Sequence, residues 1–135
     1  MSKRQVKLYL TDIDDAVSAI QSYTRDLTFE QLLADRKTRE AIILNFVVIG
    51  EAIKMIPPEI ISRYPDVPWK EFAGMRDKMV HSYFQISPVI VWETIQHDLD
   101  LLAEATRVLL REEVENDESL TLPEAKKFYK TLKKD

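Results

Sequence analysis

The sequence predicts an all-α fold, an up-and-down bundle of four to five main helices in a single domain. Apolar residues recur at steps of three and four along most of the chain, which is the period of an amphipathic helix. Residues 41–56 are apolar on nearly every side, which is typical of a helix at the centre of a bundle. The 135 residues include only two glycines and no cysteine, so they offer little material for tight β-turns and none for disulfides.

The N-terminal half is expected to form three helices. The first covers about residues 4–24, where an apolar stripe lies opposite several aspartates. Thr28 and Gln31 have the spacing of a capping box, so a short second helix is expected to begin there. The third helix covers about residues 37–56 and is expected to be the buried centre of the bundle.

Prolines set the boundaries of the next helices. Pro57 and Pro58 end the third helix, and a short helical piece is expected near residues 58–64. Pro68 suits the first turn of the following helix, which is expected to end at about residues 83–84.

One long helix is expected over residues 88–113, and it carries two apolar stripes. The stripe that can face the bundle consists of Trp92, Ile95, Leu99, Leu102, Thr106 and Leu110. The opposite ridge contains Ile90, Leu101 and Val108. This ridge is either covered by a partner subunit or is a set of scattered exposed residues.

Residues 1–114 are expected to form the bundle, and residues 115–135 an acidic linker and a basic C-terminal helix or tail. The acidic run over residues 112–118 is typical of a solvated linker. The last part of the chain contains five lysines, which are Lys126, Lys127, Lys130, Lys133 and Lys134.

Charge and hydropathy restrict the partners and the location. The formal net charge is −4, so any nucleic-acid site must be local rather than spread over a basic surface. The N-terminus leads directly into an amphipathic pattern without a secretory signal. The most apolar run, residues 41–56, is too short and too polar to span a membrane. We therefore expect a cytoplasmic protein without membrane contact.

The candidate site lies in residues 74–84. On a helical wheel Arg76 falls along the apolar stripe and not toward bulk water, and Tyr83 lies beneath it. The apolar neighbours of Arg76 on that wheel are Trp69, Phe72, Ala73, Met79 and Val80. Asp77 and His81 are four residues apart, so they are neighbours on the flank of the same helix.

Each of these residues also fits an ordinary structural role. Arg76 fits a solvated arginine whose stem lies along the edge of an apolar face. Asp77 and His81 fit a surface ion pair, and Tyr83 fits a packing residue at a helix end. A functional site is favoured because a fork of donors, a carboxylate beside an imidazole and a phenol all fall within two helical turns.

The pattern Arg76-x4-His81-x-Tyr83 resembles the signature of HEPN domains, specifically the small HepT-like family. The resemblance covers roughly residues 4–112, and its further segments are Ile49 to Lys54, Pro68-Trp69, Gly74 to Arg76 and Ile90 to Ile95. The arginine–histidine spacing alone is common, but the whole set in this order is specific. Asp77 stands where many HEPN proteins have asparagine, so its role is less defined than those of Arg76 and His81.

These residue types suit metal-independent cleavage of RNA, which carries its own nucleophile in the 2′-hydroxyl. An imidazole can accept a proton near neutral pH, so His81 is the candidate base. The guanidinium of Arg76 presents a planar fork that matches phosphate oxygens. One chain supplies one such histidine, and a two-fold homodimer would bring a second to the same cleft. No metal and no cofactor are expected.

The resemblance implies a toxin of a toxin–antitoxin pair. HEPN proteins pair helices so that two Arg-x4-His motifs line one groove, in a homodimer or a higher oligomer. The antitoxin is a small nucleotidyltransferase of the MntA type, which attaches AMP to the tyrosine two residues past the histidine. In this sequence that residue is Tyr83, where an AMP phosphate would compete for Arg76.

A second function fits the same residues: a non-catalytic helical interaction module that binds a nucleotidyltransferase partner. In this interpretation Arg76 holds a structural carboxylate, for which Glu51 on the central helix is the candidate. Growth inhibition that is lost in His81→Ala would favour the nuclease.

Overall fold

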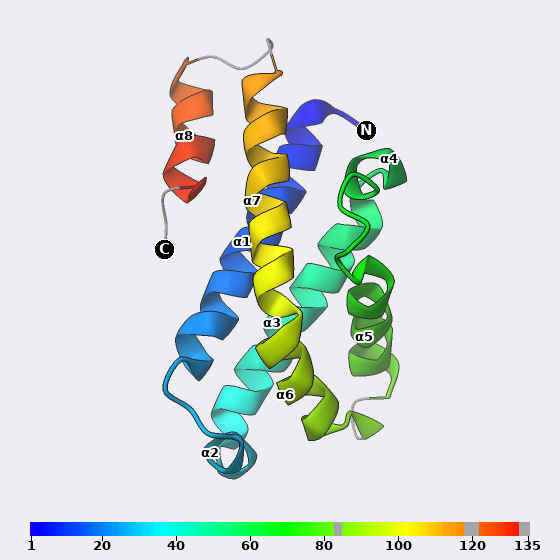
Figure 1. Ribbon diagram of the computed structural model, residues 1–135, viewed down its shortest axis with the longest axis vertical. Coiled ribbons are helices and arrows are strands. Elements are labelled where there is room, and N and C mark those ends of the chain that lie inside the picture. The colour runs from blue at the N-terminus through cyan, green and yellow to red at the C-terminus, as the bar shows by residue number, and fades with distance from the viewer. Residues whose placement is uncertain (83–84, 118–121, 133–135) are drawn as a thin grey trace.

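The computed structural model of the chain describes residues 1–82, 85–117 and 122–132 (Figure 1). The described residues form helices and no strand, so the expected all-α class is confirmed. The eight helices are α1 (Lys3–Thr24), α2 (Phe29–Ala34), α3 (Arg36–Met55), α4 (Pro58–Ile61), α5 (Trp69–His81), α6 (Pro88–His97), α7 (Leu99–Glu115) and α8 (Leu122–Leu132). No helix in these ranges is both long and apolar enough to cross a membrane.

The long helices α1, α3 and α7 run along the length of the molecule (Figure 1). Helix α3 packs against α1 and against α5, and α1 also packs against α7. The core between them is filled by apolar side chains, among them Leu10, Ile13, Phe46, Ile49 and Leu102. The α3–α5 contact includes the stacked rings of Phe46 and Phe72, whose centroids are 6.4 Å apart.

Local sequence signals begin several helices as predicted. Thr28 and Gln31 form the expected capping box at the start of α2. Pro58 and Pro88 stand in the first turns of α4 and α6. The hydroxyl oxygen of Ser87 accepts a hydrogen bond from the backbone N–H of Ile90 at 3.3 Å.

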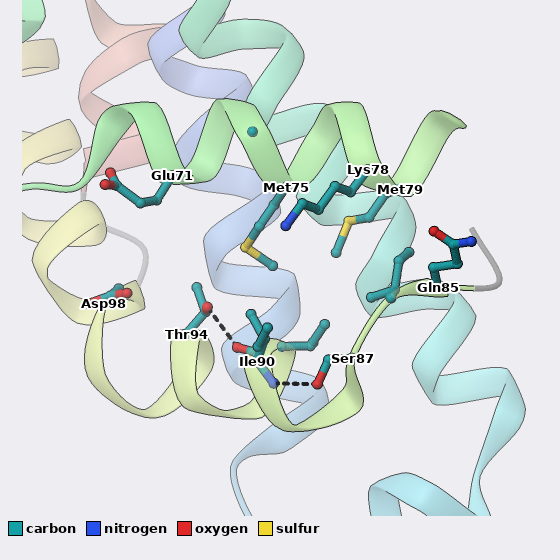
Figure 2. A pocket seen from close by; sticks show the side chains of 12 residues that line it. Glu71, Met75, Lys78, Met79, Gln85, Ser87, Ile90, Thr94 and Asp98 are labelled. Carbon is teal, nitrogen blue, oxygen red and sulfur yellow. Dashed lines mark hydrogen bonds between the residues drawn. The ribbon is translucent and has the colours of Figure 1, made fainter. Parts of the chain in front are cut away.

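The single long helix expected over residues 88–113 is wrong, because the chain breaks it at Asp98 into α6 and α7. The side chain of Thr94 donates to the carbonyl oxygen of Ile90 at 2.8 Å, a bond that bends helices. Aspartate is also a poor residue inside a helix. The break gives α6 its own direction, at an angle to α7, so that it faces α5 (Figures 1 and 2).

The acidic run over residues 112–118, expected to be solvated, is not solvated throughout. Asp117 is buried and forms an ion pair with Lys7 of α1, whose side chain is also fully buried. A buried ammonium group needs such a partner, because an unpaired charge in the core is strongly destabilising. Helix α8 packs against α1 and α7 and buries Phe128.

Candidate functional site

The candidate site is built where α5 crosses α3 at Gly50. A Cβ atom at Gly50 would overlap the Cβ of Arg76 and would lie 2.9 Å from its Cγ. It would also lie 3.1 Å from the backbone carbonyl oxygen of Phe72. Only glycine permits this approach of the two helices. The sequence places Gly50 in a segment that resembles the HepT-like pattern, and the structure gives its steric reason: the stem of Arg76 lies directly on α3.

Arg76 is held between two carboxylates. Its Nη1 donates to Oδ1 of Asp77 at 3.0 Å, and its Nε forms an ion pair with Oε1 of Glu51 on α3. The Nε contact is electrostatic, since its alignment is not that of a hydrogen bond. The side chain of Arg76 is 22% exposed, so it is partly withdrawn from water.

The expected apolar surroundings of Arg76 are present except at one residue. Trp69, Phe72 and Met79 are buried, and Ala73 is half-buried. Val80 was expected on the same stripe but is 46% exposed. The helical wheel therefore predicted the burial of Val80 wrongly, because periodicity does not show which part of an apolar stripe a neighbouring helix covers.

Asp77 contacts Lys54 and Arg76, and within the described residues it makes no bond to His81. Its Oδ1 accepts hydrogen bonds from Nζ of Lys54 and from Nη1 of Arg76. The bond from Lys54 has the largest effect in lowering the pKa of Asp77, and the bond from Arg76 lowers it further. In turn, the bond to Asp77 and the charge of Glu51 raise the pKa of Arg76 against the opposing effect of burial. Both side chains are therefore charged at neutral pH.

Lys54 is a residue of this cluster that the sequence interpretation did not select. Glu51 and Lys54 are three residues apart on α3, so both lie near α5. Glu51 pairs with Arg76, and Lys54 pairs with Asp77. Both ion pairs form only because α3 packs against α5. The sequence signals for Lys54 are its i,i+3 spacing from Glu51 and its place in the segment Ile49 to Lys54 that resembles the HepT-like pattern.

His81 is the last residue of α5 and is exposed to solvent. The carboxylate of Asp77 is instead paired with two cations, Lys54 and Arg76. Tyr83 lies outside the described residues, so its expected place beneath Arg76 stays a prediction. Among the residues that are described, no group of three or more histidine, aspartate or glutamate side chains is arranged to hold a metal ion.

An exposed apolar stripe on α3 borders the charged cluster. It consists of Leu44, Val48 and Met55, which share one face of the helix with Glu51. Leu44 is 64% exposed, although the whole of this helix was expected to be buried. Ile90 and Leu101, which belong to the apolar ridge expected on the helix over residues 88–113, are also exposed. Among these exposed apolar residues, the α3 stripe shares a helix face with Glu51, the partner of Arg76.

Comparison with known proteins places the charged cluster inside a recognised family region. Residues 13–109 match the family model described as "Ribonuclease HepT-like". The chain is similar to a protein of Thermococcus cleftensis named "Probable ribonuclease HepT", with 42% identity over 100 residues, which are 74% of this chain and 91% of that protein.

Two proteins of Methanocaldococcus jannaschii, each named as a "Putative RNase", are also similar. One is 43% identical over 95 residues, 70% of this chain and 78% of its own length. The other is 34% identical over 119 residues, 88% of this chain and 98% of its own length. No solved structure matches the chain.

Proposed function

The chain belongs to the HepT-like ribonuclease family, and from this membership we propose that it is a metal-independent endoribonuclease whose active site is shared by two copies of the chain. The observation that carries the proposal is the position of Arg76. A partly buried arginine with two carboxylate partners lies five residues before an exposed histidine, His81, on the same helix, and its partner Glu51 shares a face of α3 with an exposed apolar stripe.

His81 is the proposed proton acceptor. It takes the proton of the RNA 2′-hydroxyl, whose oxygen attacks the adjacent phosphorus. The bond from phosphorus to the 5′-oxygen then breaks, which leaves a 2′,3′-cyclic phosphate. The departing 5′-oxygen takes a proton from the imidazolium of His81 in the second copy. The exposure of His81 supports this role, because RNA must reach the ring.

Arg76 is the proposed stabiliser of the negative charge that develops on the phosphate. Glu51 and Asp77 occupy Nε and Nη1, and no bond to a described residue uses Nη2. The two carboxylates fix the plane of the guanidinium before the substrate arrives, which is the condition for electrostatic stabilisation without reorganisation. Glu51 and Asp77 are therefore supporting residues, and Lys54 holds Asp77 in place.

A two-fold homodimer is proposed because one copy of the site lacks an acid for the leaving group. The second histidine of the chain, His97, pairs with Glu93 on α6 at 2.9 Å. The α3 stripe supplies a surface that can pack against its own copy about a two-fold axis. An interface there would bring the α5 helices of both copies toward one groove.

The family further suggests that the protein is the toxin of a toxin–antitoxin pair with an MntA-like nucleotidyltransferase. We propose Tyr83 as the residue that this partner modifies with AMP, since it lies two residues after His81. Mass spectrometry of the co-expressed pair is expected to find AMP on the peptide that contains Tyr83 and none in Tyr83→Phe. AMP on another residue would contradict the assignment.

The ion pair between Arg76 and Glu51 favours a second candidate, a non-catalytic interaction module that binds a nucleotidyltransferase. In that case the arginine serves the α3–α5 contact and the histidine has no chemical task. The two candidates differ in one observable, which is RNA cleavage that depends on His81.

The test uses the purified protein, a labelled RNA and EDTA. The nuclease predicts cleavage in EDTA that is lost in His81→Ala and in Arg76→Ala, while both variants keep the wild-type circular dichroism spectrum. Cleavage that EDTA abolishes and one divalent ion restores would contradict metal independence. Cleavage that persists in His81→Ala would contradict the assigned base.

A further inference from the structure

A cavity of about 380 Å³ lies between α5 and α6, on the side of α5 away from the contact of Arg76 with α3 (Figure 2). Its volume falls in the range of small-molecule sites. Met75 and Met79 extend from α5 into the space that faces α6 (Figure 2). Polar groups also line it: Lys78 lies on α5, and Asp98 lies at the junction of α6 and α7. The cavity is therefore neither a simple packing void nor a purely apolar groove.

Gly74, in the wall of this cavity, has no steric explanation within the described chain. A Cβ atom at Gly74 would meet nothing within 4 Å, in contrast to the overlap found at Gly50. Glycine inside a helix is less stable than alanine, so the residue costs stability without serving a described contact. What it does provide is free space along the cavity wall, where a ligand can approach the backbone of α5.

The cavity opens toward the same face of α5 as the proposed catalytic histidine. Gly74, Lys78 and His81 follow each other at steps of four and three, so they lie along one face of the helix. Lys78 is exposed and forms no ion pair with a described residue. It provides a cation on the cavity wall, on the face of α5 that also carries His81.

We propose that this cavity binds the base of the nucleotide next to the cleaved phosphate, an inference that rests on the ribonuclease function proposed above. The polarizable thioethers of Met75 and Met79 pack against the faces of the base. The ammonium of Lys78 attracts its phosphate. The absence of a side chain at Gly74 leaves room for the flat ring.

Two carboxylates give the cavity a preference among bases. Glu71 lies at the end of α5 away from His81, and Asp98 lies across from it (Figure 2). Ionised carboxylates accept hydrogen bonds and donate none. They favour a base with an exocyclic amino group, such as adenine or cytosine, over uracil. Asp98 is available for this because its side chain makes no capping bond at the start of α7.

Gly74→Ala separates binding from stability. The added methyl group meets no atom, so the melting temperature is expected to stay the same or rise. The methyl group narrows the cavity, and cleavage of single-stranded RNA is expected to fall about tenfold or more, the scale of one carbon in a binding pocket. Binding of an uncleavable 2′-O-methyl RNA, measured by fluorescence anisotropy, is expected to weaken equally. The control is Gln96→Ala, at an exposed position of α6 outside the cavity.

The outcomes separate the two proposals. If the wild type cleaves no RNA, the ribonuclease proposal fails and the base site fails with it. If the wild type cleaves RNA and Gly74→Ala keeps full rate and affinity, the base site alone is wrong. A change of sedimentation coefficient in Gly74→Ala would assign the cavity to an interface between copies and would also overturn the proposal.

The base preference is tested with labelled A12, C12 and U12 RNA. The wild type is expected to bind and cleave A12 and C12 better than U12, and Asp98→Asn is expected to reduce that difference. Asp66→Asn, an exposed acid before α5, is the control that keeps the wild-type preference. Equal use of the three RNAs by the wild type, or an unchanged preference in Asp98→Asn, would contradict the role of the carboxylates.

Discussion

At the scale of single residues, the properties of the site follow from the way in which Arg76 is held. Its guanidinium has carboxylates on two sides, and Lys54 balances the second of them. The planar fork of arginine can keep both partners and still present a donor to phosphate. An ammonium group is a single point charge and cannot replace this arrangement.

Arg76→Lys is therefore expected to abolish function although it keeps the charge. RNA cleavage should fall about 100-fold or more, the loss typical when one preorganised donor at a developing charge is removed. The measurement is the initial cleavage rate of a labelled RNA, with thermal melting as the control for folding. A variant with near-wild-type rate would show that charge alone is sufficient.

The charged cluster also predicts a dependence of stability on pH. The pKa of Asp77 is lowered by Lys54 and Arg76, so its contribution to stability is present above the pKa of the unfolded chain, about 3.9. That contribution is lost as the pH falls through the lower folded pKa. Asp77→Asn should therefore melt below the wild type at pH 7, and the difference should shrink in acid. A difference that is the same at pH 7 and below pH 3 would contradict the ion-pair account.

At the scale of helices, the α3–α5 contact positions the site because Gly50 lets Arg76 lie against α3. Two glycines in the chain have opposite surroundings. A Cβ atom at Gly50 would meet the Cβ of Arg76 and the backbone of Phe72, which cannot move aside easily. A Cβ atom at Gly74 would face open space. The same substitution at the two positions therefore tests the packing directly.

Gly50→Ala is expected to destabilise the fold by about 1–3 kcal/mol, the usual cost of overpacking, and to displace Arg76. Gly74→Ala is the matched control and is expected to stabilise the fold by up to about 1 kcal/mol. Urea unfolding followed by circular dichroism measures both. Equal effects of the two substitutions would mean that α3 and α5 do not approach each other as described.

The helix class and the helix starts were predictable because their signals are local. Thr28, Pro58 and the Ser87-Pro88 pair each act within one turn of chain. The break at Asp98 was not predictable, since the apolar period continues through it on both sides. The exposed face of α3 was missed for a related reason: periodicity shows that a side chain is apolar but not whether a neighbour covers it.

The candidate site was predictable in its residues but not in its pairings. The wheel placed Arg76 toward the interior and Asp77 near His81. Asp77 pairs with Lys54 and not with His81, and this pairing depends on the packing of α3 against α5. Contacts between distant parts of the chain, such as the Lys7–Asp117 ion pair, have no local signal at all.

At the scale of the whole molecule, we propose that the exposed α3 stripe is the dimer interface. It runs beside Arg76, whereas the surface at Ile90 and Leu101 lies on α6 and α7. In this proposal, an interface through α3 would bring the His81 residues of both copies to one substrate.

Leu44→Glu is expected to break the dimer and lower RNA cleavage, because it places a charge in the proposed interface. Leu44 is largely exposed, so the stability of the single chain should change by no more than about 0.5 kcal/mol. Leu101→Glu is the matched control on the other apolar surface and should leave both properties unchanged. Sedimentation velocity and cleavage rates check both variants. The opposite result would place the interface on α6 and α7.

The most direct test of RNA cleavage by a histidine-based, metal-independent site is the chemistry of the product ends. RNA cut by the protein in EDTA should carry a 2′,3′-cyclic phosphate on one fragment and a 5′-hydroxyl on the other, as mass spectrometry can determine. A substrate with a 2′-O-methyl group at every position should remain intact. Fragments with a 5′-phosphate and a 3′-hydroxyl would contradict the account, because they require water and not the 2′-hydroxyl as the nucleophile.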